Sequence, residues 1–163
     1  MASILKVNTI QDATNSNTAM TIDSSGRVSR SLIPSFKAYK SSSGNVTYAA
    51  GAVISADFDS TNFNVGNHFS TSTGLFTAPI AGLYLFGCSL FNNTPSGQKR
   101  VSLFDNTNHA FGGQGQSSNG NDFVMSAITQ LSVGNTVDVR AAYDDTTIYQ
   151  GLGHSYFWGY FIG

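Results

Sequence analysis

The sequence predicts an all-β protein, and more specifically a jelly-roll sandwich. Only 10% of the 163 residues are charged, whereas the exposed faces of soluble helices usually carry many Glu and Lys side chains. From about residue 32 onward, short runs rich in Val, Ile, Phe and Tyr recur at intervals of roughly 8 to 15 residues. Gly, Asn, Ser or Pro bounds most of these runs and supplies the turns. Short strands at regular spacing are typical of sandwiches and jelly rolls.

The candidate strands lie within these ranges, in chain order: 35–40, 52–58, 67–79, 82–91, 100–106, 109–113, 123–133, 136–144 and 155–163. One of them has an alternative, because "FVMSAITQL" at 123–131 could form a helical turn or two. That segment has no cap and no charged face, so a strand is favoured.

Two of the candidate strands are apolar on both faces. In 82–91, Tyr84, Phe86 and Cys88 share one face, and Leu83, Leu85 and Ser89 share the other. In 155–163, the two sets are Tyr156, Trp158, Tyr160 and Ile162 against Phe157, Gly159 and Phe161. A sandwich buries only one face of each sheet. The second face needs another cover, and a neighbouring subunit is the simplest one, so the pattern predicts self-association.

The apolar run 74–86 does not predict membrane insertion. It is shorter than the ~18 residues of a membrane helix, and Pro79 and Gly82 interrupt it. The net charge of -1 gives no electrostatic basis for binding nucleic acid.

No catalytic or metal site is expected. Cys88 is the single cysteine, ends an apolar run, and is interpreted as a buried, inert thiol. The three histidines are dispersed, and no G-x-S-x-G nucleophile motif is present. Asp144 and Asp145 could contribute to a calcium site, but two carboxylates supply few of the 6 to 8 oxygens required. A solvated turn is therefore favoured, no cofactor is expected, and the protein is not expected to be an enzyme.

The glycine-rich segment 111–123 has two interpretations. It is either a flexible exposed loop or a receptor-contact loop, whose amide side chains would bind sugar hydroxyls. In the second case the contacting residues would be Gln114, Gln116, Asn119 and Asn121.

The first 30 residues differ from the rest of the chain. They are polar, with small apolar islands that include Ile4, Leu5, Val7 and Ile10. "TIDSSGRV" at 21–28 indicates two extended pieces joined by a turn. Thirty such residues cannot bury a core of their own. We therefore predict an attachment segment at 1–30 and a jelly-roll domain at 31–163.

The spacing of aromatic residues resembles the C1q/TNF family. The matching positions are Phe58, Asn64, Phe69, Phe76, Gly82, Tyr84 and Phe86, and Cys88 stands where the family usually has another aromatic residue. The ending "SYFWGYFIG" is similar to the last strand of that family through Ser155, Phe157, Gly159 and Tyr160.

This resemblance implies a ten-stranded jelly roll that forms a homotrimer around a threefold axis. It places Leu83, Leu85, Phe157 and Phe161 toward the axis and Tyr84, Phe86, Trp158 and Tyr160 in the core of each subunit. The alternative is that the two sets are exchanged.

The opening "MASILKVNTIQD" and the later "TIDSSGRV" resemble structural and tail-fibre proteins of tailed phages, notably marine and cyanobacterial ones. This resemblance implies a virion protein, with a trimeric fibre or knob attached to other virion proteins through Ile4, Leu5, Val7 and Ile10. Such a knob could bind a host-surface glycan. The alternatives are a trimeric capsid decoration (cement) protein and a bacterial carbohydrate-binding module.

Overall fold

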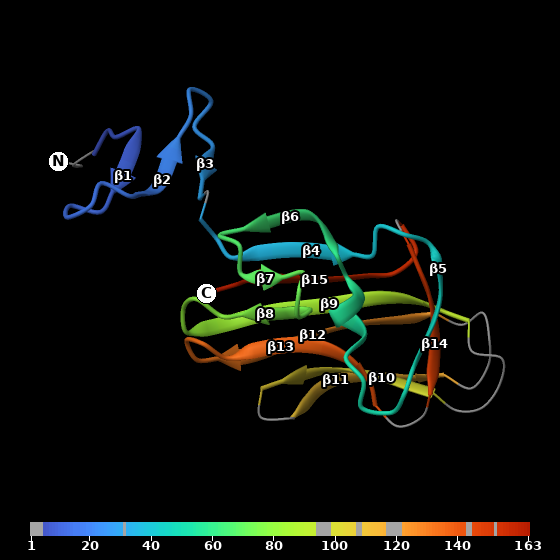
Figure 1. Ribbon diagram of the computed structural model, residues 1–163. Helices are drawn as coiled ribbons and strands as arrows, with labels where there is room; N and C mark the ends of the chain where they lie inside the picture. The colour runs from blue at the N-terminus through green and yellow to red at the C-terminus, as the bar shows by residue number, and fades with distance from the viewer. Residues whose placement is uncertain are drawn as a thin grey trace. The chain divides into compact units, whose positions relative to one another are not determined.

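The computed structural model describes residues 5–30, 32–93, 99–106, 109–116, 122–142, 145–151 and 153–163 (Figure 1). The chain divides into two compact units, Met1–Ile33 and Pro34–Gly163. The sequence placed the boundary at residue 30, three residues earlier.

The N-terminal unit contains a three-stranded antiparallel sheet. Its strands are β1 (Thr9–Gln11), β2 (Thr18–Ile22) and β3 (Val28–Ser29). The turn between β2 and β3 is held by Asp23, whose Oδ1 accepts hydrogen bonds from the backbone N–H groups of Ser25 and Arg27. Gly26 takes the positive φ of 79° that this turn needs. The two extended pieces predicted from "TIDSSGRV" are therefore present.

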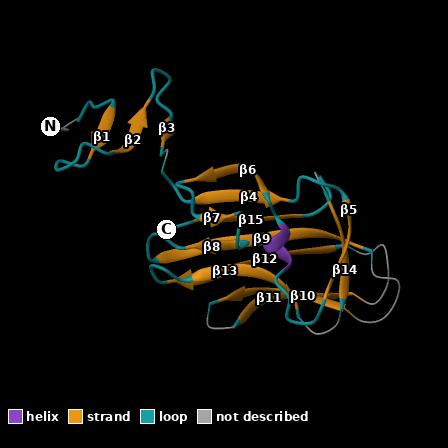
Figure 2. Ribbon diagram, viewed as in Figure 1, coloured by secondary structure: helices purple, strands orange, loops and turns teal. Residues whose placement is uncertain are grey.

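The second unit is a β-sandwich of two sheets (Figure 2). The seven-stranded sheet contains β4 (Ser35–Tyr39), β5 (Gly44–Tyr48), β6 (Ser60–Val65), β9 (Gly82–Asn92), β12 (Phe123–Leu131), β14 (Thr146–Gln150) and β15 (Tyr156–Phe161). The five-stranded sheet contains β7 (Phe69–Ser70), β8 (Leu75–Thr77), β10 (Lys99–Asp105), β11 (Ala110–Gln116) and β13 (Thr136–Ala141).

The all-β prediction is confirmed, and so is the strand at 123–131. The described part of the unit has twelve strands, close to the ten that the family resemblance implies, and β7 and β8 are only two and three residues long.

One predicted strand is wrong. Segment 52–58 forms the short 3-10 helix η1 (Ile54–Asp57) in place of a strand. Val53 makes a single bridge to Arg140, and the backbone N–H of Phe58 then donates to the carbonyl of Ser55. The chain turns inward here because Ile54 and Phe58 are both completely buried.

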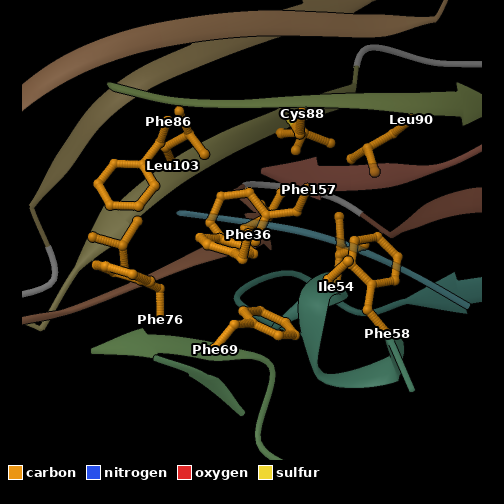
Figure 3. Packing of buried hydrophobic residues seen from close by; sticks show 14 of the residues in the cluster. Phe36, Ile54, Phe58, Phe69, Phe76, Phe86, Cys88, Leu90, Leu103 and Phe157 are labelled. Carbon is orange, nitrogen blue, oxygen red and sulfur yellow. The ribbon is translucent and has the colours of Figure 1, made fainter. Parts of the chain in front are cut away.

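Aromatic rings fill the space between the two sheets (Figure 3). Phe36 stacks on Phe69 with ring centroids 4.7 Å apart and meets Phe157 edge-on at 4.9 Å. Phe76 meets Phe86 edge-on at 5.2 Å. Each such pair adds about 0.5–1.5 kcal/mol beyond the burial of its area. Aromatic residues from both sheets therefore stabilise the sandwich.

Asn64 joins the end of β6 to the start of β7. Its side-chain amide nitrogen donates to the carbonyl oxygen of Phe69 at 2.8 Å, and its oxygen accepts from the Phe69 backbone N–H at 3.1 Å. Phe69 is 3% exposed. The two hydrogen bonds thus fix the backbone that carries a core ring.

A polar network joins β5, η1 and β14. The Tyr48 hydroxyl donates to Oδ2 of Asp57 at 2.7 Å and accepts a hydrogen bond from the side-chain amide of Gln150. Tyr48 is 6% exposed and Gln150 is fully buried. Burial and the Asp57 carboxylate raise the pKa of Tyr48, so the phenol stays protonated and can act as the donor.

Replacing Tyr48 with phenylalanine is expected to destabilise the domain by about 1–3 kcal/mol, because the Gln150 amide would lose its acceptor while buried. Urea unfolding followed by circular dichroism measures this change. Tyr39→Phe is the matched control, because Tyr39 lies on β4 at the opposite face and is only partly buried. An equal loss in both variants would contradict the role of the network.

The sulfur of Cys88 is enclosed by the core. Cys88 is 1% exposed, and burial raises the pKa of its thiol to about 12. Because the thiolate is the reactive form, we expect no reaction with a thiol-specific disulfide reagent at pH 8 in the folded protein. One thiol per chain should react in urea. Rapid labelling without denaturant would contradict this burial.

Candidate subunit interface

The register between β9 and β15 decides which side chains face outward. Phe86 pairs with Gly159, and Leu85 pairs with Tyr160. Residues directly opposite each other on antiparallel strands point to the same face of a sheet. Phe86 belongs to the buried core, so Gly159 shares the inner face, while Leu85 and Tyr160 share the outer face.

This register corrects half of the sequence-based interface. Phe157 pairs with Cys88 and is 0% exposed, so it belongs to the core and cannot contact another subunit. Phe161 packs against the buried Tyr84 ring with centroids 5.0 Å apart. Conversely Tyr160, which the sequence placed in the core, is 46% exposed. A shift of one residue in phase moves every side chain of a strand to the other face.

Glycine at position 159 is explained by the same packing. A Cβ atom there would lie 2.6 Å from ring atoms of both Phe36 and Phe86. The two rings occupy the space that any side chain at 159 would need. On the inner face of β15, Gly159 therefore leaves the space that the rings of Phe36 and Phe86 occupy.

The outer face is a set of aligned rows across β12, β9 and β15. The rows pair Ile128, Leu85 and Tyr160; Ser126, Gly87 and Trp158; and Val124, Ser89 and Tyr156. Leu83 extends the face, and the Ile162 backbone N–H donates to its carbonyl oxygen. Leu83 is 42% exposed, Ile128 59% and Val124 63%. The face formed by these rows and Leu83 is called the outer apolar face below, because its large side chains are apolar. A surface of this kind usually marks an interaction site.

A shallow pocket of about 210 Å³ lies in the middle of the outer apolar face. It is lined by Cys88, Ser89, Val124, Met125, Ser126, Tyr156 and Trp158. The Trp158 ring lies across Gly87, where an added Cβ would be only 2.4 Å from the indole. Glycine at 87 thus lets the indole lie flat on β9. The pocket has the dimensions and the mostly apolar lining to take one side chain of a partner.

A cation lies beside the same face on the neighbouring strand. Lys37 on β4 is opposite Trp158, and its ammonium lies 4.1 Å from the centroid of the Tyr156 ring. Such a cation–π contact contributes about 0.5–1 kcal/mol at an exposed site. The face therefore has an aromatic and aliphatic centre with a charged side chain at its border.

The other residues singled out in the sequence do not gather into one site. Leu5 and Ile10 of the N-terminal unit are 83% and 44% exposed, Val7 is half-buried, and Ile4 lies outside the described residues. Gln114 and Gln116 belong to β11 by their backbone, while Asn119, Asn121 and Asp144 lie outside the described residues. The proposed receptor loop and calcium site therefore remain predictions.

Among the described residues, no three or more His, Cys, Asp and Glu side chains lie close enough together to hold a metal ion. None of the helices found there is long and apolar enough to cross a membrane.

Sequence reasoning missed the contribution of β12. Val124 and Ile128 lie on its outer face, whereas Ser126 and Gln130 between and after them are polar. An ordinary exposed face of a strand also alternates apolar and polar residues, so the sequence alone does not single these side chains out. Only the pairing of Ile128 with Leu85 shows that these side chains extend the apolar rows of β9.

The fold and the sequence were compared with known proteins. Residues 36–162 match the model of the C1q domain. The mouse complement C1q tumor necrosis factor-related protein 3 is 32% identical over 85 residues, which cover 51% of this chain and 35% of that protein. The match thus spans little more than a third of the length of the mouse relative.

Solved structures show the same fold. The Eiger TNF of S. frugiperda has a TM-score of 0.65 at 15% identity and covers 81% of this chain and 94% of its own. The globular domain of the zebrafish complement 1qA protein has a TM-score of 0.58 at 17% identity, over 80% and 98%. Murine APRIL has a TM-score of 0.62 at 6% identity, over 80% and 99%. These similarities confirm the jelly roll.

C1q and TNF domains are typically trimeric modules that bind partners or build structures, with no catalytic role. The aromatic positions that carried the resemblance, Phe58, Phe69, Phe76, Tyr84 and Phe86, are all buried in the core of the sandwich. Because residues 36–162, most of this chain, match the family model, the chain belongs to the C1q domain family.

Proposed function

We propose that this chain forms a homotrimer in which the outer apolar face contacts the neighbouring subunit. The proposal extends to a role as a structural knob of a phage particle, attached through residues 1–30. The observation that carries it is the row of Ile128, Leu85 and Tyr160, three adjacent and partly or largely exposed apolar side chains at the centre of a sheet.

Burial of this face by a second copy is the simplest way to remove it from water. Each Å² of apolar surface buried contributes about 25 cal/mol, and the exposed side chains here include Val124, Ile128 and Leu83. The net charge of only -1 leaves little repulsion between copies. C1q and TNF homologues form homotrimers, which supports a trimer of this chain in preference to a dimer.

Light scattering of the purified protein tests the assembly directly. We expect a particle with three times the 17.3 kDa mass of one chain at micromolar concentration. A monomer of 17.3 kDa under these conditions would reject the homotrimer.

Residues 1–30 are the proposed attachment segment. Leu5 and Ile10, together with Val28 at 58% exposure, present apolar side chains on a sheet of only three short strands. A sheet of this size gains stability when another protein covers it. The similarity of the opening residues to phage structural proteins supports a virion as that partner, and the relatives named above are animal proteins, so the virion role depends on this segment.

Deleting residues 1–30 is expected to leave a trimer that is no longer incorporated into particles. Incorporation at the level of the full chain would reject the attachment role.

Labelling the full chain on intact particles separates the two virion locations, because a tail knob and a capsid decoration protein would label different parts of the particle. Absence from purified virions would favour the free carbohydrate-binding module.

A further inference from the structure

Three aromatic side chains meet on the surface where β14 pairs with the end of β9. The rings of Phe91 and Tyr149 are 5.9 Å apart, those of Phe91 and His154 are 5.9 Å apart, and those of Tyr149 and His154 are 4.9 Å apart. All three pairs are edge-to-face, with interplanar angles of 65°, 89° and 84°. Phe91 is 36% exposed and His154 is exposed, so the rings form a surface cluster outside the hydrophobic core.

Two amides lie beside these rings. Asn45 on β5 is directly opposite Tyr149, which is in turn opposite Phe91. The side-chain nitrogen of Asn93 donates to Oδ1 of Asn45 at 2.8 Å. This bond uses one donor and one acceptor, so the Asn45 amide nitrogen and the Asn93 oxygen can serve a ligand.

The next row is also polar and uncharged. The hydroxyls of Thr47 and Thr147 are 2.8 Å apart, and the backbone N–H of Asn93 donates to the carbonyl of Thr147. The two rows, with His154 in the turn after β14, therefore gather three rings, two amides and two hydroxyls beside one face of β5, β14 and β9. We call the five residues Asn45, Phe91, Asn93, Tyr149 and His154 the ring-and-amide cluster.

The chemistry of this cluster selects one class of ligand. Its side chains contain no carboxylate, ammonium or guanidinium group, so no permanently charged group in it favours an ionic partner. The rings are in contact with one another, which leaves no space between them for a caged cation. A saccharide presents an apolar C–H face that can lie on rings and hydroxyls that bond amides, and the cluster supplies both kinds of partner.

The cluster continues the outer face of β9 beyond Ser89, away from the row of Leu85 and Tyr160. Figure 1 shows β5 and β14 at the end of the sandwich away from the C-terminus. Leu83 and Ile162 lie at the opposite end of β9 and at the C-terminus, respectively. A subunit centred on the row of Leu85 would therefore cover the middle of the sheet before it reached Tyr149.

We propose that the ring-and-amide cluster is a binding site for a neutral saccharide. Tyr149 and Phe91 provide the apolar platform, and Asn45 and Asn93 bond the hydroxyl groups. All residues of the site belong to one domain, so saccharide binding does not require the trimer. Only the use of the site to contact a host surface rests on the proposed function.

The test uses the full chain on a panel of immobilised neutral oligosaccharides of glucose, galactose, mannose and N-acetylglucosamine, with sialylated and sulfated counterparts. We expect retention on at least one neutral glycan. Titration calorimetry with the best neutral glycan should then show about tenfold weaker binding for Asn45→Ala and for Tyr149→Ala. Asn45 is exposed, so its variant remains informative even where the loss of Tyr149 disturbs folding.

Asn106→Ala is the matched control, because Asn106 is an exposed asparagine beyond the end of β10. It should bind as the parent protein does. Three results would overturn the proposal: no retention on any neutral glycan, full binding by Asn45→Ala, or a changed particle mass for the variants, which would make the cluster a subunit contact. Light scattering on the same samples reports the trimer independently, so failure of the saccharide site and failure of the assembly are distinguishable.

Discussion

Phe157→Ala is expected to lower the free energy of unfolding by about 3–5 kcal/mol, one of the larger losses available to a single substitution in this chain. Phe157 is fully buried and meets the rings of Phe36 at 4.9 Å and of Phe69 and Phe86 at 6.1 Å. Removing its ring leaves a cavity between the sheets, where the remaining rings cannot close up freely. Urea unfolding at fixed protein concentration measures the loss, because association adds to apparent stability.

Tyr160→Ala is the matched control on the same strand. Its side chain lies on the outer apolar face at 46% exposure, so at a protein concentration low enough to dissociate the subunits its unfolding free energy should differ from that of the parent by less than about 1 kcal/mol. If Phe157→Ala instead altered the particle mass while leaving unfolding unchanged, the inner and outer faces of β15 would be exchanged. The pair of variants thus decides the orientation of the last strand.

Leu85→Asp is expected to convert the proposed trimer to a folded monomer. Leu85 lies between Ile128 and Tyr160 in the middle row of the outer apolar face. A partner would bury the new carboxylate among the apolar side chains of this row, and an uncompensated buried charge costs several kcal/mol. Light scattering measures the mass, and circular dichroism checks that the β-structure persists.

Thr77→Asp serves as the control for the added charge. Thr77 is an exposed residue of β8 in the five-stranded sheet, so it changes net charge equally without touching the outer apolar face. It should remain a trimer. A Leu85→Asp protein that also stays trimeric would show that another surface holds the subunits together.

The sequence predicted the faces of β9 correctly and those of β15 incorrectly, for a physical reason. Tyr84 and Phe86 are buried in the core, and Leu83 is exposed, as the alternation suggested. In β15 both faces carry aromatic residues, so no polar residue marks the solvent side. Pairing with β9 sets the phase, and this long-range information is absent from local alternation.

Strands β5, β6 and β14 were also missed, although β5 and β14 form one edge of the seven-stranded sheet and β6 forms the other. Their sequences, "GNVTY", "STNFNV" and "TTIYQ", are rich in Asn and Thr. Such segments resemble loops, because asparagine favours turns and only half of each strand is apolar. The ring-and-amide cluster was therefore hidden too, since Asn45, Phe91 and Tyr149 become neighbours only through the pairing of these strands.

Trp158, which lies against Gly87, is an intrinsic fluorophore on the outer apolar face. It is the only tryptophan in the chain, and it lines the pocket of the outer apolar face, away from the rings of the core. Its fluorescence maximum should respond to dilution and to loss of quaternary contact, at conditions where the sandwich is intact. The intrinsic emission of the unmodified protein can therefore follow subunit exchange in real time, with no dye attached.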